Sequence, residues 1–248
     1  MTTSLQQLNE AIRLNNHAAM HINSGMFEIA ISTLAAALKA SRQILDNGAA
    51  DRKEKDDIFT LDQCILSAQQ DERRLSCNYQ NQEDESDSGD VMYQRQQYKE
   101  GPTFLFRRAI EIPTSLDEAN DYGSSVMISV IIIFNLALAH QQAGIVGDEI
   151  CKAKLNKAAK LYELAYSLQR EESMEGTALF TMATINNLGM IYDSLEETAT
   201  AGKCFQHLLS TLMFMIDCGE SKTISQFEGF FANTSHLIFP HNSAAAAA

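Results

Sequence analysis

The chain has 248 residues but contains no tryptophan, only three prolines and only twelve glycines. So few turn-forming residues argue against an all-β protein, whose many short strands need frequent turns. Hydrophobic residues make up 45% of the chain and charged residues 21%, which is ordinary globular composition. A chain of this length can form one substantial core or one elongated array of small units.

Positive charge is also scarce, with 19 lysines and arginines against 32 aspartates and glutamates and a net charge of -13. Nucleic acids and anionic membrane surfaces recruit positive protein surfaces, so we expect neither as a partner. The most apolar run, VMISVIIIFNLALAH, is interrupted by Ser129 and Asn135. It predicts a buried helix, too short to span a bilayer, rather than membrane insertion.

The five cysteines are odd in number and form no C-x-x-C pair. Reduced thiols in a reducing compartment are the simplest interpretation. No basic start followed by an apolar run is visible at the N-terminus, so no secretory signal is expected. We therefore expect an intracellular protein, cytoplasmic or nuclear, and treat the glycosylation sequon at Asn233 as chance.

Apolar residues at three-to-four spacing predict helices through most of the chain. Residues 4–46 form two helical patterns, with Gly25 as the stop between them. Four more patterns, separated by short breaks typical of antiparallel neighbours, span residues 124–143, 151–170, 175–194 and 198–217.

The region between the first two patterns and the other four predicts other kinds of structure. Residues 54–75 predict a weak helix, and the acidic stretch QNQEDESDSGD predicts a mobile loop. A Gly101-Pro102 turn within residues 91–112 favours a small β-hairpin. The predicted organisation is a helix hairpin at 1–48, an insertion at 49–123, two further hairpins at 124–217, a capping segment at 218–243 and an alanine tail at 244–248.

A repeat is visible in INNLGMIYDSLEETATAGKCF, where Leu188-Gly189, Tyr192, Ala201 and Phe205 follow one another. This order resembles the tetratricopeptide repeat. The hairpins at 1–48 and 124–170 carry weaker versions, and no unit has the early tryptophan or the closing proline of that family. The resemblance implies an all-α fold of antiparallel helix hairpins stacked as a short superhelix.

Small residues in such repeats let two antiparallel helices approach closely. Ala18 and Ala137 occupy the place of Gly189 in the other two units. Glycine inside a helix costs about 1 kcal/mol relative to alanine. We therefore expect Gly189 at a helix–helix contact, where Phe205 fills the space that glycine leaves.

Asparagine recurs two residues before these small positions, at Asn16, Asn135 and Asn187. The family resemblance implies that this phase of the first helix lines a concave groove, where an amide bonds the backbone of an extended bound peptide. Such asparagines would be partly exposed, and alanine would replace them without loss of the fold. The alternative is that they satisfy a neighbouring loop or face water.

Helical spacing extends this groove to further residues. No lysine or arginine lies among them, so a basic clamp for an acidic C-terminus is not expected. A neutral, part-apolar groove instead suits a helix or an extended segment with apolar anchors. The predicted groove residues are Asn16, Ile131, Phe134, Asn135, Leu138, Gln142, Ala183, Asn186, Asn187, Met190 and Asp193.

Little in the sequence points to catalysis or to a cofactor. His17 and His21 lie four apart and could bind a metal, but no further ligand is suggested nearby, and both coincide with packing positions. The leading hypothesis is a non-enzymatic module that binds another protein or a peptide segment. The alternatives are a structural subunit within a larger assembly, which an exposed aromatic C-terminal stretch would favour, and an enzyme on a helical scaffold.

Overall fold

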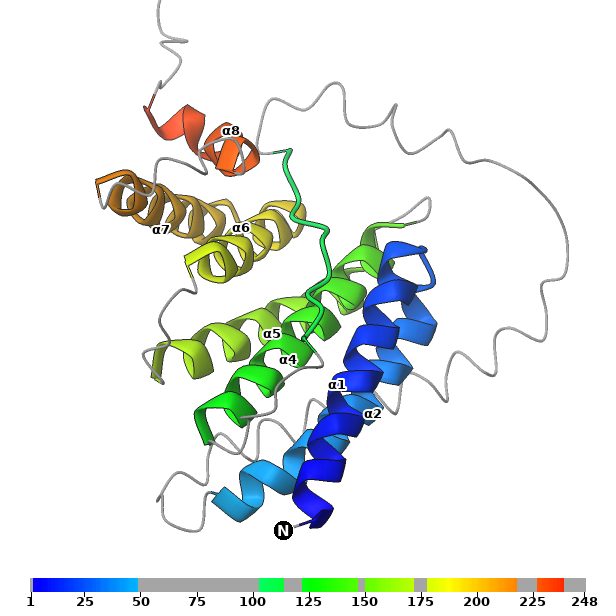
Figure 1. The fold of residues 1–248 in the computed structure, drawn as a ribbon. Coiled ribbons are helices and arrows are strands. Elements are labelled where there is room, and N and C mark those ends of the chain that lie inside the picture. The colour runs from blue at the N-terminus through cyan, green and yellow to red at the C-terminus, as the bar shows by residue number, and fades with distance from the viewer. Residues whose placement is uncertain are drawn as a thin grey trace, which may run out of the picture. The chain divides into compact units, whose positions relative to one another are not determined.

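The computed structural model describes residues 2–48, 103–113, 122–146, 150–171, 178–217 and 227–238. Within these ranges all regular structure is helical and no strand occurs, which confirms the all-α prediction (Figure 1). The helices are α1 (Thr2–Asn23), α2 (Phe27–Gly48), α4 (Tyr122–Ile145), α5 (Lys152–Glu171), α6 (Ala178–Ser194), α7 (Thr198–Asp217) and α8 (Glu228–Ile238).

The chain divides into two compact units, and the first comprises Met1–Asp84 and Arg107–Met174. It contains two helix hairpins: α1 packs on α2, α4 packs on α5, and α2 joins them by packing on α4. Phe134 of α4 meets Tyr162 of α5 edge to face, with ring centroids 5.4 Å apart, and neither side chain is exposed. An ion pair between Glu28 and Lys154 links the starts of the two second helices.

The second unit comprises Glu85–Phe106 and Glu175–Ala248, with α6 packed on α7 and α8 packed on both. Gly189 of α6 lies where the predicted contact requires a small residue. A Cβ atom at this position would lie 2.9 Å from Phe205 Cε1 and 3.2 Å from Cys204 Cβ. Phe205 is almost fully buried, so the aromatic ring fills the space beside the glycine.

Two of the helix hairpins turn in the same way. After α1, the N–H groups of Gly25 and Met26 donate to the carbonyls of Ile22 and His21, and Gly25 has a φ of 76°. After α6, the N–H groups of Glu196 and Glu197 repeat this pattern, and Glu196 has a φ of 67°. Both are Schellman turns, in which a left-handed residue ends the helix. The predicted stop at Gly25 is therefore confirmed.

The insertion differs from its prediction where it is described. Residues 103–113 are extended but pair with no strand among the described residues, so the prediction of a β-hairpin is wrong for this arm. The other arm, the weak helix at 54–75, the acidic loop and the alanine tail lie outside the described residues. The hydrogen bonds of residues 103–113 go instead to helix side chains.

Helix α4 is longer than its apolar run suggests. Within the described residues, Val126–Ile145 is the one helix long and apolar enough to cross a membrane by length and composition. The expectation that this run is too short was therefore wrong. The same window is 83% buried inside the fold, as expected of a core helix.

Replacing Gly189 with leucine should lower the free energy of unfolding by about 1–3 kcal/mol, because the added side chain overpacks the contact with Phe205. Urea denaturation followed by circular dichroism measures this loss. The control is Gly202→Ala in α7, where an added Cβ meets no atom within 4 Å. That change should raise the stability by up to about 1 kcal/mol; equal stabilities for the two variants would contradict the packing role of Gly189.

Candidate functional site

The candidate site is built around the extended segment 103–113, with sequence TFLFRRAIEIP, drawn in green in Figure 1. An extended backbone without a strand partner must find other partners for its N–H and C=O groups. Its polar residues Thr103, Arg107, Arg108 and Glu111 are exposed, whereas Ile112 is buried. The segment therefore presents its charged side chains to solvent while its backbone is held by helices.

In the first unit, three asparagines form what we call the first clamp: Asn15 and Asn16 of α1 and Asn135 of α4. The Ile110 N–H donates to Asn135 Oδ1 at 2.9 Å, and the Ile110 carbonyl accepts from Asn135 Nδ2 at 2.8 Å and from Asn15 Nδ2 at 3.0 Å. Asn16 bonds Ile112 in the same way: its side chain accepts from the Ile112 N–H at 2.8 Å and donates to the Ile112 carbonyl at 2.7 Å. Alternate residues of the segment are thus held through both backbone groups.

In the second unit, the second clamp consists of Asn186 and Asn187 of α6 and Asn233 of α8. The Phe104 N–H donates to Asn233 Oδ1 at 2.9 Å, and its carbonyl accepts from Asn233 Nδ2 at 2.7 Å and from Asn186 Nδ2 at 3.1 Å. Asn187 accepts from the Phe106 N–H at 3.0 Å and donates to the Phe106 carbonyl at 2.8 Å. Each bond of the first clamp has its counterpart here.

The two clamps are equivalent in sequence as well as in geometry. A shift of 171 positions carries Asn15 and Asn16 onto Asn186 and Asn187, and the same shift relates the two Schellman turns. Within each clamp the asparagines also bond one another: Asn135 Nδ2 donates to Asn15 Oδ1, as the α8 asparagine does to Asn186 Oδ1. Helix α8 therefore supplies to the second clamp the asparagine that α4 supplies to the first.

Burial overturns one expectation about these asparagines. Asn135 and Asn187 were predicted to be partly exposed, but both are fully buried. The bound segment covers them, and their amides are satisfied by its backbone. Of the six clamp asparagines, those with no exposed surface are Asn15, Asn135, Asn186, Asn187 and Asn233.

A glycine in α8 makes room for an aromatic side chain of the segment. A Cβ atom on Gly229 would lie 2.2 Å from Phe104 Cδ2, so the ring rests directly on the helix backbone. Phe230 of the same helix meets Phe104 edge to face, with centroids 5.1 Å apart, and stacks on Phe106 at 6.1 Å. We call this contact the Gly229 notch; it accommodates the Phe104 ring next to the second clamp.

The predicted groove residues divide into three groups. Four of them belong to the clamps: Asn16, Asn135, Asn186 and Asn187. Two more lie beside the segment or a clamp, since Gln142 donates to the Arg107 carbonyl at 3.5 Å and Met190 Sδ lies 3.6 Å from Asn233 Nδ2. Phe134 packs on Tyr162, and the Asp193 carbonyl accepts a hydrogen bond in the turn after α6. Leu138 and Ala183 are fully buried, and Ile131 is half-buried.

Two clamp residues, Asn15 and Asn233, are not among the predicted groove residues. Asn15 adjoins Asn16 in the pattern that Asn186 and Asn187 repeat, so the doubling was the available signal. Asn233 was dismissed as a chance glycosylation sequon, although an asparagine in the apolar helical stretch FFANTSHLI fits the same clamp role. Its side chain is fully buried.

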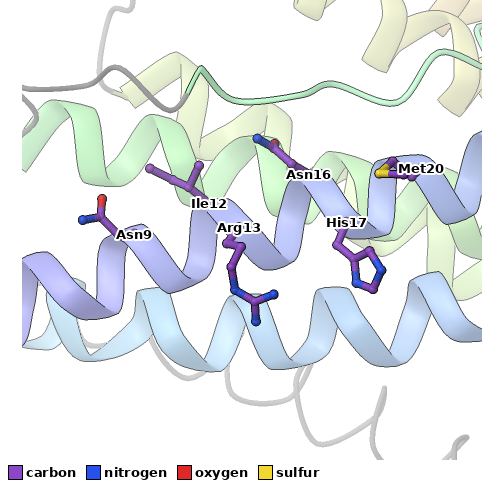
Figure 2. Close-up of a pocket in the computed structure, with 6 residues that line it drawn as sticks. All are labelled: Asn9, Ile12, Arg13, Asn16, His17 and Met20. Carbon is purple, nitrogen blue, oxygen red and sulfur yellow. The ribbon is translucent and has the colours of Figure 1, made fainter.

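The outer face of α1 carries a different set of side chains. Figure 2 shows a hollow along this helix in which Asn16 points toward the extended segment, whereas Arg13 and His17 point to the other side. Arg13 donates to Glu10 at 2.7 Å on the exposed surface. This hydrogen bond, with the charge of Arg13, lowers the pKa of Glu10, and Glu10 in turn raises the pKa of Arg13.

Among the described residues, the histidine pair of α1 has no further metal ligands around it. The rings of His17 and His21 lie 4.5 Å apart, tilted against each other. Across the described ranges, no group of three or more histidine, cysteine, aspartate or glutamate side chains could hold a metal ion.

Comparisons of the chain with family models, with curated proteins and with solved structures gave no match.

Replacing Asn135 or Asn187 with alanine should lower the free energy of unfolding by about 1–3 kcal/mol each, because a part-buried N–H of the segment loses its partner and the carbonyl of the same residue loses a hydrogen bond. Thermal melting of each variant measures the loss. The matched control is Asn156→Ala on the exposed face of α5, which should melt at or slightly above the wild-type temperature. Clamp variants that melt like this control would show that the segment's bonds contribute nothing to stability.

Gly229→Ala should displace Phe104, because the added methyl group occupies the position of the ring. Amide hydrogen exchange should then speed up at Phe104 and Phe106, by on the order of tenfold or more if docking weakens by about 1.4 kcal/mol. Gly202→Ala is again the control, since alanine there meets open space. Unchanged exchange in Gly229→Ala would mean that the ring is not held in the notch.

Proposed function

We propose that this chain is a non-enzymatic protein-interaction module of tetratricopeptide-like helix hairpins, which binds an extended segment of a partner protein. The observation that carries this proposal is the pair of equivalent asparagine clamps. Each clamp bonds both the N–H and the carbonyl of two alternate residues in an extended chain. A catalytic site needs no such ladder of backbone contacts, whereas peptide recognition does.

The chemistry of the clamps supports a peptide as the ligand. An asparagine amide offers a donor and an acceptor at the spacing of a peptide group, so it recognises backbone whatever the side chain. The apolar surroundings, such as the Gly229 notch, add preference for particular side chains. No charged side chain takes part in either clamp, so a neutral, part-apolar segment fits better than an acidic tail.

A second candidate function is that of a structural subunit in a larger assembly. Three large apolar side chains near the end of α7 favour it: Met213, Phe214 and Ile216, exposed by 49%, 65% and 37%. Of the aromatic stretch that could also favour it, Phe227 and Phe230 are buried and Phe231 is half-buried, whereas Phe239 lies outside the described residues. Size-exclusion chromatography of the isolated chain separates the two functions: a monomer supports the interaction module, and aggregation supports the subunit.

The test of peptide binding uses the full chain with its own segment weakened by Phe104→Ala and Ile112→Ala, one apolar anchor from each clamp. A fluorescein-labelled peptide, TFLFRRAIEIP, is added in increasing amounts, and its anisotropy is measured. We expect saturable binding of this peptide and a rise in the melting temperature of the chain, since a ligand stabilises the folded state that it binds. No binding, or a chain that folds neither alone nor with peptide, contradicts the proposal.

Backbone methylation of the peptide supplies the matched control without changing the protein. An N-methyl group at the position of Phe106 or Ile110 removes an N–H that donates a hydrogen bond to a clamp asparagine. Affinity should fall by about tenfold, the equivalent of about 1.4 kcal/mol for one hydrogen bond left unmade. Methylation at Leu105 or Glu111, whose N–H groups donate to neither clamp, should lower the affinity less. Equal losses of affinity at all four positions would contradict backbone recognition.

A further inference from the structure

We propose that residues 103–113 are a built-in competitor for the two clamps, and that the partner is a protein whose extended segment carries apolar side chains at alternate positions. This inference rests on the proposed function and names the ligand class and the regulation of the same sites. The structure contains an example of such an occupant, bound by backbone and side chain together.

The bound segment defines the chemistry of the ligand. The second clamp holds Phe-Leu-Phe, with both aromatic residues gripped through their backbones and Phe104 seated in the Gly229 notch. The first clamp holds Ile-Glu-Ile in the same register, with Ile112 buried. Each clamp therefore takes an apolar residue, any residue and a second apolar residue, and the second clamp prefers an aromatic ring at the first position.

The segment must leave before a partner can enter. The clamp amides have no exposed surface while it is bound, apart from that of Asn16, which is half-buried. A ligand attached to its own receptor acts at a high effective concentration. The apparent affinity of a partner is then reduced in proportion to the fraction of chains whose clamp is open. A change that weakens the segment, without altering the clamp, should raise the affinity for a peptide added from outside.

Phe104→Ala makes this change, because it removes a side chain of the competitor and leaves α6 and α8 intact. The experiment measures anisotropy of the labelled TFLFRRAIEIP peptide with the full wild-type chain and with the variant. We expect the variant to bind on the order of tenfold more tightly, since a larger fraction of its clamps is open. The matched control is Phe214→Ala, the same chemical change at an exposed position in α7, which should bind as the wild type does.

Two further comparisons test the ligand class. Adding Gly229→Ala to Phe104→Ala fills the notch and should abolish the gain. A peptide with serine in place of both phenylalanines and both isoleucines should lose binding to every variant, whereas serine in place of Leu105 alone should not. Equal binding of the two serine peptides would overturn the proposed ligand class.

The outcomes separate this inference from the proposed function. Equal peptide affinity for wild type and Phe104→Ala would overturn the competitor and leave peptide binding in place. Binding to neither chain would overturn both. If Phe104→Ala does not fold, hydrogen exchange of the wild type decides: amides of Phe106 and Ile110 that exchange faster than the helix cores support a segment that detaches, and amides that exchange only with global unfolding overturn it.

Discussion

The structure depends on how an extended backbone is satisfied when it lies against helices instead of strands. Helices use up their own backbone groups and offer no ladder to a neighbouring chain. Side-chain amides supply what is missing, because asparagine carries a donor and an acceptor in the arrangement of a peptide group. Without the amides of Asn135 and Asn187, the N–H and carbonyl groups of Ile110 and Phe106 would lose these hydrogen bonds on folding.

This constraint explains residues that are otherwise unfavourable in helices. Asparagine and glycine are poor helix formers, and fully buried amides are costly unless they are hydrogen-bonded. In both units the cost is offset by two bonds to one residue of the segment. Gly229 is explained in the same way, since the absence of a side chain there lets the Phe104 ring contact the helix backbone.

Under the proposed function, the same contacts would both stabilise the fold and form a site for a ligand. In that proposal, an extended chain with suitable apolar side chains would replace the segment, with the clamps binding any backbone and the Gly229 notch adding a preference for a side chain. A site that binds its own segment tightly gains stability and loses availability, a conflict common where function requires an element to move. The strength of the segment's docking would therefore set both the stability of the chain and the proposed affinity for a partner.

Local pattern was enough to predict the helices, the stop at Gly25, the tight contact at Gly189 and the special place of Asn16, Asn135 and Asn187, because these follow from helical periodicity and from the size and polarity of single residues. Local pattern could not predict which groups the asparagines bond. Asn16 bonds a residue 96 positions away, and Asn233 one 129 positions away. An extended segment has no helical period, and its aromatic and β-branched residues suggested a hairpin instead. Only folding, which brings distant segments together, decided that the chain's own backbone fills the clamps and buries their amides.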